Sequence, residues 1–327
     1  MGITLYKNAD WILTMNEKRE KFRHGDLLIS GKEILDVGND LEKKYAGKLQ
    51  IDKIINAKGT VILPGFVNVH HHTWQSLIRN IQATRGLKLE PWLTVMYEIY
   101  KDLNTDVARA GVYSGLGDML KTGCTTSNDL WYPHPIGVKY LVDAEIEAAA
   151  EIGIRFHPTR GFHSVPSDIV PPEVVDTKES VTEDTIRLVK KYHDRSRFSM
   201  CQVGIAPSIA QYETEDIIEA VVDLAEEYDI MVHGHLAESQ HEVEYTLKTW
   251  GCRPFEWFKR HRLLGKRFYF AHCIHLNEEE IEQMAETGTG VAHCPISNML
   301  LSSGACPVPS YLKRGLTRIG LGVDGAA

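Results

Sequence analysis

The spacing of hydrophobic residues changes about sixty residues into the chain. Before that point, short stretches alternate apolar and polar residues and are separated by turn-forming residues, a pattern typical of β-strands. Gly31 and Lys32 separate two of these stretches, as the two residues of a hairpin turn would. Residues 1–60 are therefore expected to form a small β-sheet module. Its predicted strands are Ile3–Tyr6, Trp11–Met15, Asp26–Ser30, Glu33–Val37 and Ile51–Ile55.

From Val61 onward, short apolar runs alternate with longer amphipathic stretches. Eight repeats of a strand followed by a helical stretch predict a (β/α)8 TIM barrel for residues 61–327. The predicted strands are Phe66–His70, Cys124–Ser127, Ile154–Thr159, Met200–Ala206, Ile230–His235, Phe268–His272, Gly290–His293 and Arg318–Val323. The predicted helices include Asp106–Lys121, Gly137–Ile152, Glu179–His193, Thr214–Tyr228, Asn277–Thr287 and Val308–Arg314.

The sequence stops at Ala327, directly after the eighth predicted strand. The helix that should cover this strand is absent, so we expect the sequence to be truncated relative to a longer chain.

Composition and charge narrow the classes of partner. The chain has 327 residues, of which 43% are hydrophobic and 24% charged, which is typical of a soluble globular protein. Lys and Arg number 36 against 44 Asp and Glu, a net charge of −8, and no basic run occurs; this argues against nucleic acid and membrane as partners. There is no signal-peptide pattern, and the six cysteines form no CxxC pair. We therefore expect reduced thiols and a cytoplasmic location.

Histidine and aspartate mark five of the eight predicted strand ends. In a barrel the carboxyl ends of the strands meet at one mouth, where reactive residues gather. Imidazole and carboxylate are suitable ligands for Zn²⁺ or Fe²⁺, so this set predicts a metal site. His71 lies between two histidines that share one face of the strand and is expected to point the other way. The strand-end residues are His70, His72, His235, His272, His293 and Asp324.

The motifs around these residues resemble those of the metal-dependent amidohydrolase superfamily, and within it the aminohydrolase and chlorohydrolase branch. The stretches His70–Leu77, Arg155–Gly161 and Gly288–Cys294 are most similar to the 8-oxoguanine deaminases of that branch. The motifs that carry the resemblance are Pro64–His72, His235–Glu238, Phe270–Cys273, His293–Asn298 and Gly322–Gly325. The resemblance implies a barrel joined to a β-sandwich to which residues 1–60 contribute.

The resemblance also implies residue roles. One divalent ion, Zn²⁺ or alternatively Fe²⁺, would be held by His70, His72, His235 and Asp324. Asp324 would accept a proton from the attacking water, Glu238 would carry a proton to the ring nitrogen of the substrate, and His272 would hydrogen-bond the water or the developing oxyanion. A single ion is expected because the fourth strand has no lysine to bridge a second one. Substrate contacts would come from Gln75, Arg160 and His293, with Asn298 on the same rim.

The implied function is hydrolytic deamination of an aminated nitrogen heterocycle, an oxidised purine such as 8-oxoguanine or a pterin-like ring. Two alternatives stay open: a chlorohydrolase or alkylaminohydrolase of triazine-like rings, and a catalytically silent barrel that binds a heterocycle. The expected partner is a small molecule, and self-association into a homo-oligomer stays open.

Several side chains near the predicted site have more than one reading. His233 shares a face with His235 and is an alternative ligand. His163 is a candidate substrate contact on the loop after the third strand. Trp74 and Trp92 could stack on a flat ring or pack in the core. Pro166, Pro171 and Pro172 mark a long loop after the third strand that could be a lid or only a surface excursion.

Overall fold

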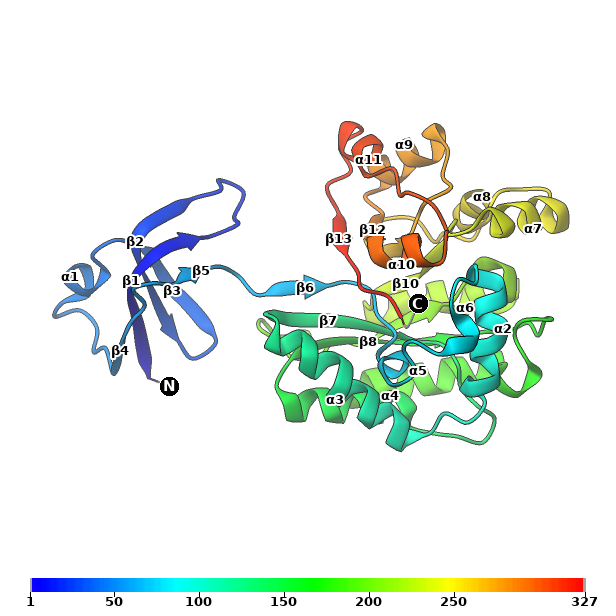
Figure 1. Ribbon diagram of the computed structural model, residues 1–327, viewed down its shortest axis with the longest axis horizontal. Coiled ribbons are helices and arrows are strands. Elements are labelled where there is room, and N and C mark those ends of the chain that lie inside the picture. Colours follow the sequence, from blue (N-terminus) through cyan, green and yellow to red (C-terminus); the bar gives the residue numbers. More distant parts are fainter. Residues whose placement is uncertain (1, 326–327) are drawn as a thin grey trace. The chain divides into compact units, whose positions relative to one another are not determined.

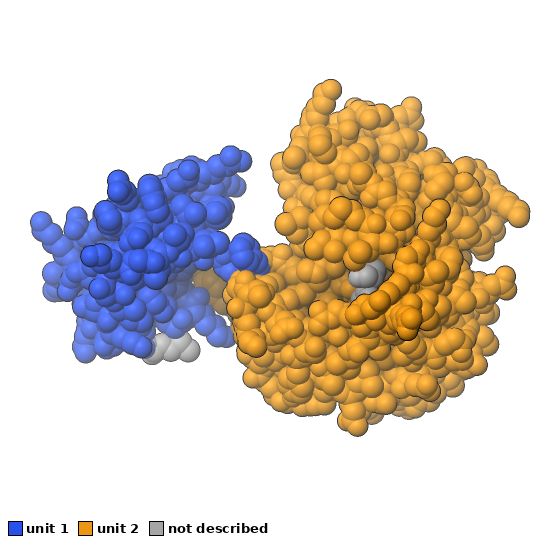
Figure 2. Space-filling model, viewed as in Figure 1, with its two compact units in different colours: residues 1–66 blue, residues 67–327 orange. Residues whose placement is uncertain are grey.

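The protein is described here by a computed structural model that covers residues 2–325. The chain divides into two compact units, Met1–Phe66 and Val67–Ala327, which Figure 2 shows in different colours. None of the helices in the described part of the chain combines the length and hydropathy needed to cross a bilayer.

The first unit is a five-stranded sheet with the order β3-β2-β1-β4 and with β5 also paired to β1. The predicted hairpin is confirmed, because β2 and β3 are antiparallel and Gly31 between them has a positive φ of 55°. The first two predicted strands are instead one strand, β1, whose register shifts between Tyr6 and Ala9. An irregularity of this kind lets one strand continue where the alternation breaks. The elements are β1 (Ile3–Leu13), β2 (Lys21–Ser30), β3 (Glu33–Gly38), α1 (Leu41–Tyr45), β4 (Lys53–Asn56) and β5 (Val61–Ile62).

The second unit is a closed barrel of eight strands in sequence order, so the predicted (β/α)8 barrel is confirmed (Figure 1). Its strands are β6 (Phe66–Asn68), β7 (Cys124–Trp131), β8 (Arg155–Phe162), β9 (Gly204–Pro207), β10 (Val232–Leu236), β11 (Phe268–His272), β12 (Gly290–His293) and β13 (Ile319–Leu321). The fourth strand begins four residues later than predicted, and Cys201 keeps only an isolated bridge to Phe156. Most of the buried apolar residues of this unit form one large core, and Ala271, Ala292 and Cys294 form a small separate cluster.

Helices connect successive strands of the barrel. The predicted helices form within a few residues of their expected bounds; for example, Asn277 and Glu280 cap α9 with a reciprocal capping box. The helix predicted from Gly137 begins only at Leu141, after Tyr140 in a left-handed conformation. The principal helices are α2 (Leu89–Tyr100), α3 (Thr105–Lys121), α4 (Leu141–Ile152), α5 (Lys178–Tyr192), α6 (Glu215–Tyr228), α7 (Gln240–Trp250), α8 (Pro254–Arg260), α9 (Glu278–Thr287), α10 (Pro295–Leu300) and α11 (Val308–Lys313).

Short 3-10 turns follow some of the barrel strands at their carboxyl ends. They are η1 (Thr73–Leu77) and η2 (Gln82–Thr84) after β6, η3 (Pro172–Val174) after β8 and η4 (Ala210–Tyr212) after β9. Together with α2, which the sequence pattern did not predict, η1 and η4 contribute walls to the cavity described below.

Candidate metal centre and active site

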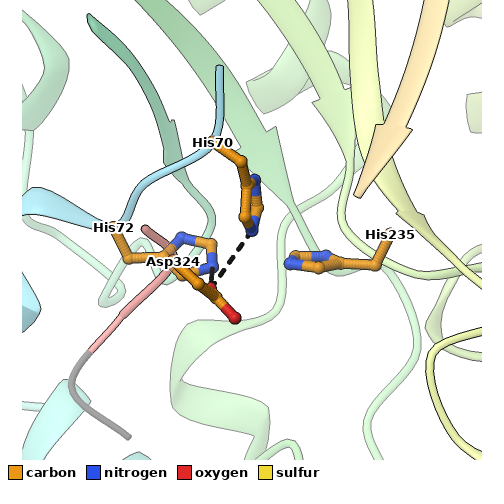
Figure 3. Close-up of side chains that lie close together, drawn as sticks. All are labelled: His70, His72, His235 and Asp324. Atoms are coloured by element: carbon orange, nitrogen blue, oxygen red, sulfur yellow. Dashed lines mark ion pairs between the residues drawn. The ribbon is translucent and has the colours of Figure 1, made fainter. Parts of the chain in front are cut away.

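Four buried side chains from three separate parts of the barrel converge at one point. His70 and His72 follow β6, His235 lies near the end of β10, and Asp324 follows β13 (Figure 3). Their ligand atoms all lie within 4.8 Å of one another. The Nε2 atoms of His70 and His72 lie 3.2 and 3.3 Å from the same oxygen, Oδ1 of Asp324. This is the arrangement that the sequence motifs led us to expect.

Backbone carbonyls fix the protonation of two of these imidazoles. His72 Nδ1 lies 2.7 Å from the carbonyl oxygen of Leu130, and His235 Nδ1 lies 2.7 Å from that of Ser208. A carbonyl oxygen can only accept a hydrogen bond, so each Nδ1 carries the proton. The Nε2 lone pair of each ring is therefore free to bind a metal, as is usual for metal-ligating histidines.

A second histidine performs the same task for His70. His233 Nδ1 lies 2.9 Å from the carbonyl oxygen of Tyr269, so this nitrogen is the donor and His233 Nε2 is an acceptor. His70 Nδ1 lies 2.7 Å from His233 Nε2 and donates to it. Both nitrogens of His233 are thus engaged, which argues against His233 as a metal ligand. Gly234 lets this strand lie close to β9, because a Cβ there would be 2.3 Å from the carbonyl oxygen of Pro207.

The donor set fits a divalent cation. His70 Nε2 is fully buried and has no hydrogen-bond partner among the described residues. Burial lowers the pKa values of His70 and His235 well below the ordinary value, so these rings are neutral. Unprotonated nitrogens therefore face a carboxylate with no proton between them, which is unfavourable unless a cation binds there. Three imidazoles and one carboxylate suit Zn²⁺ in particular.

Asp324 is held in place through its backbone as well as its side chain. Its amide donates to the carbonyl oxygen of His70 at 3.1 Å, and its own carbonyl oxygen accepts from His71 Nδ1 at 2.5 Å. His71 thus faces away from the cluster and has a structural contact, in line with the alternation of the strand. Ser297 Oγ donates to the second carboxylate oxygen at 2.6 Å.

At the ends of three barrel strands, residues in or next to the candidate site have a left-handed backbone conformation. Ala237, His272 and Asp324 have φ values of 49°, 70° and 62°. Left-handed backbone is costly for residues other than glycine and persists only where surrounding contacts enforce it. The carboxyl mouth of the barrel therefore carries backbone strain beside the cluster.

Glu238 and His272 stand next to the cluster. Oε2 of Glu238 lies 3.3 Å from Nε2 of His272, and the same nitrogen lies 3.7 Å from Oδ2 of Asp324. Burial, reinforced by the charge of Asp324, raises the pKa of Glu238 well above its ordinary value. A protonated Glu238 can donate a proton, and His272 can reach the same region. Asn298 supports His272 by placing its side-chain oxygen 2.8 Å from Nδ1.

Glu242 is a functional support that the sequence analysis missed. Its two carboxylate oxygens accept from the backbone amides of Ala237 and Glu238 at 3.0 and 2.9 Å. The Ser239 hydroxyl caps the same helix, α7, by accepting from the amide of Glu242 at 3.1 Å. The Ser-x-x-Glu spacing is a recognised helix-start signature and could have revealed this clamp. Glu242 thereby fixes the turn that presents Glu238.

One cavity opens onto the cluster, and some of the predicted substrate contacts line it. Gln75 lines it and donates to the Tyr132 hydroxyl at 3.3 Å; His163 lines it as well. Trp92 lines it, whereas Trp74 packs in the core with its ring 4.5 Å from that of Trp131. Among the described residues, the lining is His72, Gln75, Leu89, Glu90, Trp92, Leu93, Tyr97, Tyr132, His163, Ser208, Ile209, Gln211, Tyr212, His235, Glu238, His272, Ser297, Leu301, Asp324 and Gly325.

Arg160 and His293 are placed differently from what we expected. Arg160 is buried, but its guanidinium donates to Asp176 at 2.8 and 3.0 Å and to Asp184 at 3.1 Å, and it lines a different cavity. A buried arginine requires such carboxylate partners, so its expected contact with the heterocycle is not supported by the structure. His293 ends β12 but does not line the cavity over the cluster.

The loop after the third strand has internal support. Asp176, within this loop, donates its amide to the carbonyl oxygen of His163 at 2.8 Å, and Ser164 and Val165 donate theirs to the carbonyl oxygen of Tyr212 at 2.9 and 3.0 Å. These bonds tie the loop to the ends of neighbouring strands.

Known proteins share both the sequence and the fold. The chain is 36% identical over 275 residues to an 8-oxoguanine deaminase of Pseudomonas aeruginosa, covering 83% of this chain and 61% of that protein. It is 29% identical to a hydroxydechloroatrazine ethylaminohydrolase of a Pseudomonas species, covering 100% and 69%. The crystal structure of an atrazine chlorohydrolase from Arthrobacter aurescens, complexed with zinc, superimposes with a TM-score of 0.91 at 25% identity, covering 99% and 72%.

The chain thus spans roughly two thirds of the length of these relatives, 61% in the case of the 8-oxoguanine deaminase. The sequence profile of the amidohydrolase family matches residues 61–327, which include the whole barrel. This protein belongs to the amidohydrolase family.

Proposed function

We propose that this protein is a zinc-dependent hydrolase that releases ammonia from an aminated nitrogen heterocycle, with 8-oxoguanine as the first substrate to test. The observation that carries the proposal is the meeting of four metal-ligating side chains with Glu238 and His272 beside one cavity. The 8-oxoguanine deaminase among its relatives supports the reaction type and the ring.

In this proposal, His70, His72, His235 and Asp324 hold one divalent ion. Zn²⁺ is favoured by the ligand set and by the zinc in the related chlorohydrolase structure, and Fe²⁺ is the alternative. Such an ion supplies Lewis acidity that makes water a nucleophile at neutral pH. The buried rings cannot easily protonate, so they remain available as ligands near pH 7.

Two carboxyl groups of the chain then transfer protons. Asp324 accepts one proton from the attacking water as its oxygen bonds to the amino-bearing ring carbon. Glu238 donates its proton to the adjacent ring nitrogen, for which its raised pKa is suited. His272 hydrogen-bonds the oxygen as it becomes negatively charged. Asp324 then passes its proton to the amino group, the carbon–nitrogen bond breaks and ammonia leaves. The hydroxyl proton that remains on the ring carbon passes to Glu238 as the carbonyl forms, so both carboxyl groups return to their starting states.

The test is ammonia release by protein that has been loaded with one equivalent of Zn²⁺. We expect turnover of 8-oxoguanine, or of another member of a panel of purines, pterins, pyrimidines and triazines, and loss of turnover in Glu238→Gln. The matched control is Glu244→Gln, the same change at an exposed position on α7. Absence of ammonia release across the whole panel would overturn the proposal.

A second candidate keeps the site and changes the leaving group. The ethylaminohydrolase and the chlorohydrolase among the relatives support hydrolysis of triazine-like rings. Product analysis separates the candidates, since ethylamine or chloride would replace ammonia. A silent heterocycle-binding barrel is disfavoured by the presence of Glu238, because binding alone does not require a proton donor.

A small-molecule partner and a cytoplasmic location belong to the same proposal. All six cysteines are free thiols, which suits a reducing compartment.

A further inference from the structure

Gln211 is a buried polar residue on the wall of the cavity that Glu238, His272 and Asp324 also line. It lies in η4, directly after β9, and only 6% of its surface is exposed. Its side-chain oxygen Oε1 has no hydrogen-bond partner among the described residues. A buried acceptor left without a donor costs on the order of 1–3 kcal/mol, so it is rarely retained without a reason.

The neighbouring tyrosine defines which end of the amide is unsatisfied. Burial raises the pKa of Tyr212 to about 12, and a hydrogen bond with Gln211 opposes this rise. Because Gln211 Oε1 makes no hydrogen bond among the described residues, the amide nitrogen is the group left to make this bond, and an amide nitrogen can only donate. The carbonyl oxygen is left as an acceptor that requires an N–H or O–H group.

The rest of the wall restricts what can bring that donor. Tyr97, Tyr132 and Tyr212 line the cavity, and aromatic rings of this kind suit a flat ligand. None of the described lining residues is a lysine or an arginine, so a phosphate or carboxylate group on the ligand would find no counter-ion on this wall. A neutral heterocycle with a ring N–H meets both conditions.

We propose that Gln211 is a specificity-determining residue whose carbonyl oxygen accepts a hydrogen bond from a ring N–H of the substrate. This inference rests on the proposed function and adds which feature of the ring the protein recognises. That feature is an N–H donor at a position other than the amino-bearing carbon. Replacement of that hydrogen by a methyl group leaves the acceptor unsatisfied and adds bulk, so N-methylated rings bind poorly.

The experiment measures binding separately from turnover. Zinc-loaded Glu238→Gln protein, which retains the cavity without turning over, is titrated calorimetrically with 8-oxoguanine and with its 7-methyl and 9-methyl derivatives. We expect at least one methyl derivative to bind about tenfold more weakly than the parent ring. When Gln211→Leu is combined with Glu238→Gln, the affinity for the parent ring should fall about tenfold. The affinity for the weakly bound methyl derivative should stay within about twofold, so the protein no longer prefers the parent ring.

Two further variants give the result its meaning. Gln211→Glu keeps an acceptor at this position, so we expect this variant to preserve the preference for the ring N–H. If Gln211 instead donates to the substrate, Gln211→Glu would lose the preference. Gln283→Leu makes the same substitution on α9, outside the cavity lining, and should change nothing. Zinc content and melting temperature of each variant establish that the fold is retained.

The outcomes separate this inference from the proposed function. If the wild-type holoenzyme deaminates the ring but Gln211→Leu binds all three compounds as Gln283→Leu does, only the inference about Gln211 is overturned. An equal loss of affinity for all three compounds in Gln211→Leu also overturns it, because that pattern indicates a packing effect. If no ring binds and none is turned over by the wild-type holoenzyme, both proposals fall.

Discussion

Two strand ends of the barrel bury polar side chains in opposite ways. At the end of β8, Arg160 is saturated, because Asp176 and Asp184 accept from its guanidinium. His70 Nε2, after β6, and Gln211 Oε1, after β9, are buried and have no hydrogen-bond partners among the described residues. The side chains are buried in both places, but of these three only Arg160 has hydrogen-bond partners for all of its side-chain polar atoms. At this mouth of the barrel, Gln211 lines the cavity over the cluster and its Oε1 is unsatisfied, whereas the charge of Arg160 is paired and Arg160 lines a different cavity.

The largest expected effect comes from breaking the unsatisfied cluster at its carboxylate. Asp324→Asn keeps the volume but removes the charge, so we expect loss of bound zinc and a fall in ammonia release of about a thousandfold or more. Metal analysis and a coupled ammonia assay measure both. Asp184→Asn makes the same change at the saturated site and should retain one equivalent of zinc. Full activity of Asp324→Asn would show that the metal assignment is wrong.

The saturated site should respond in stability instead. Arg160→Met leaves buried Asp176 without its partner, and we expect the free energy of unfolding to fall by about 3–5 kcal/mol. The KM of the folded variant should stay within about twofold of the wild-type value. Urea denaturation and steady-state kinetics test the two expectations. Arg262→Met, which removes an exposed pair with Asp223, should cost less than about 1 kcal/mol. A tenfold rise in the KM of Arg160→Met at unchanged stability would support the substrate contact that we had expected for Arg160.

Disruption of the hydrogen bonds that link His70 through His233 to Tyr269, the histidine relay, should have an intermediate effect on zinc affinity. His233→Phe preserves the ring that stacks on Tyr269 at 4.1 Å but can no longer accept from His70. We expect zinc affinity to fall by about 10–100-fold, as measured by competition with a chelator. His157→Phe is the control, since the imidazole of His157 bonds the carbonyl oxygen of Gln202 and His157 lies outside the cluster. Unchanged affinity in His233→Phe would mean that the relay does not orient the ligand.

The smallest expected effect is a pH dependence at Glu242. Burial raises the pKa of Glu242 to about 7, so the folded protein holds a proton that the unfolded chain releases near pH 4.5. The stability contributed by this group is complete below about pH 4.5 and is lost as the pH rises toward 7. The stability difference between wild type and Glu242→Gln should therefore be larger at pH 5 than at pH 8, by about 1–3 kcal/mol. Denaturation curves at the two pH values test this, and a gap that widens with pH would contradict it.

The barrel and the cluster were predictable because both follow from repetition. Strands that alternate with helices leave few topologies, and in a barrel every strand end reaches the same mouth. The expected metal ligands came from the resemblance of the motifs at those ends to a known family, as for the histidines that follow β6. These signals are local in sequence, so they survive without knowledge of side-chain packing.

The misplaced and missed residues depend on pairings between distant segments. Arg160 ends a strand like the ligands do, but its partners lie 16 and 24 residues further along the chain, and nothing in the spacing marks them. Gln211 belongs to a short turn whose wall position is set by packing rather than by alternation. Glu242 is the exception, because its helix-start signature was readable.

The imidazoles of the cluster are oriented by groups on barrel strands and by Ser208, the residue directly after β9. His72 is fixed by a carbonyl of β7, His235 by a carbonyl at the end of β9, and His70 through β10 and β11. The segments that shape the cavity, such as α2 and η4, supply none of these bonds. If the proposed function holds, protein engineers could exchange those segments to admit a different ring without altering the bonds that orient the proposed metal ligands, so that chemistry and substrate choice could evolve independently on this scaffold.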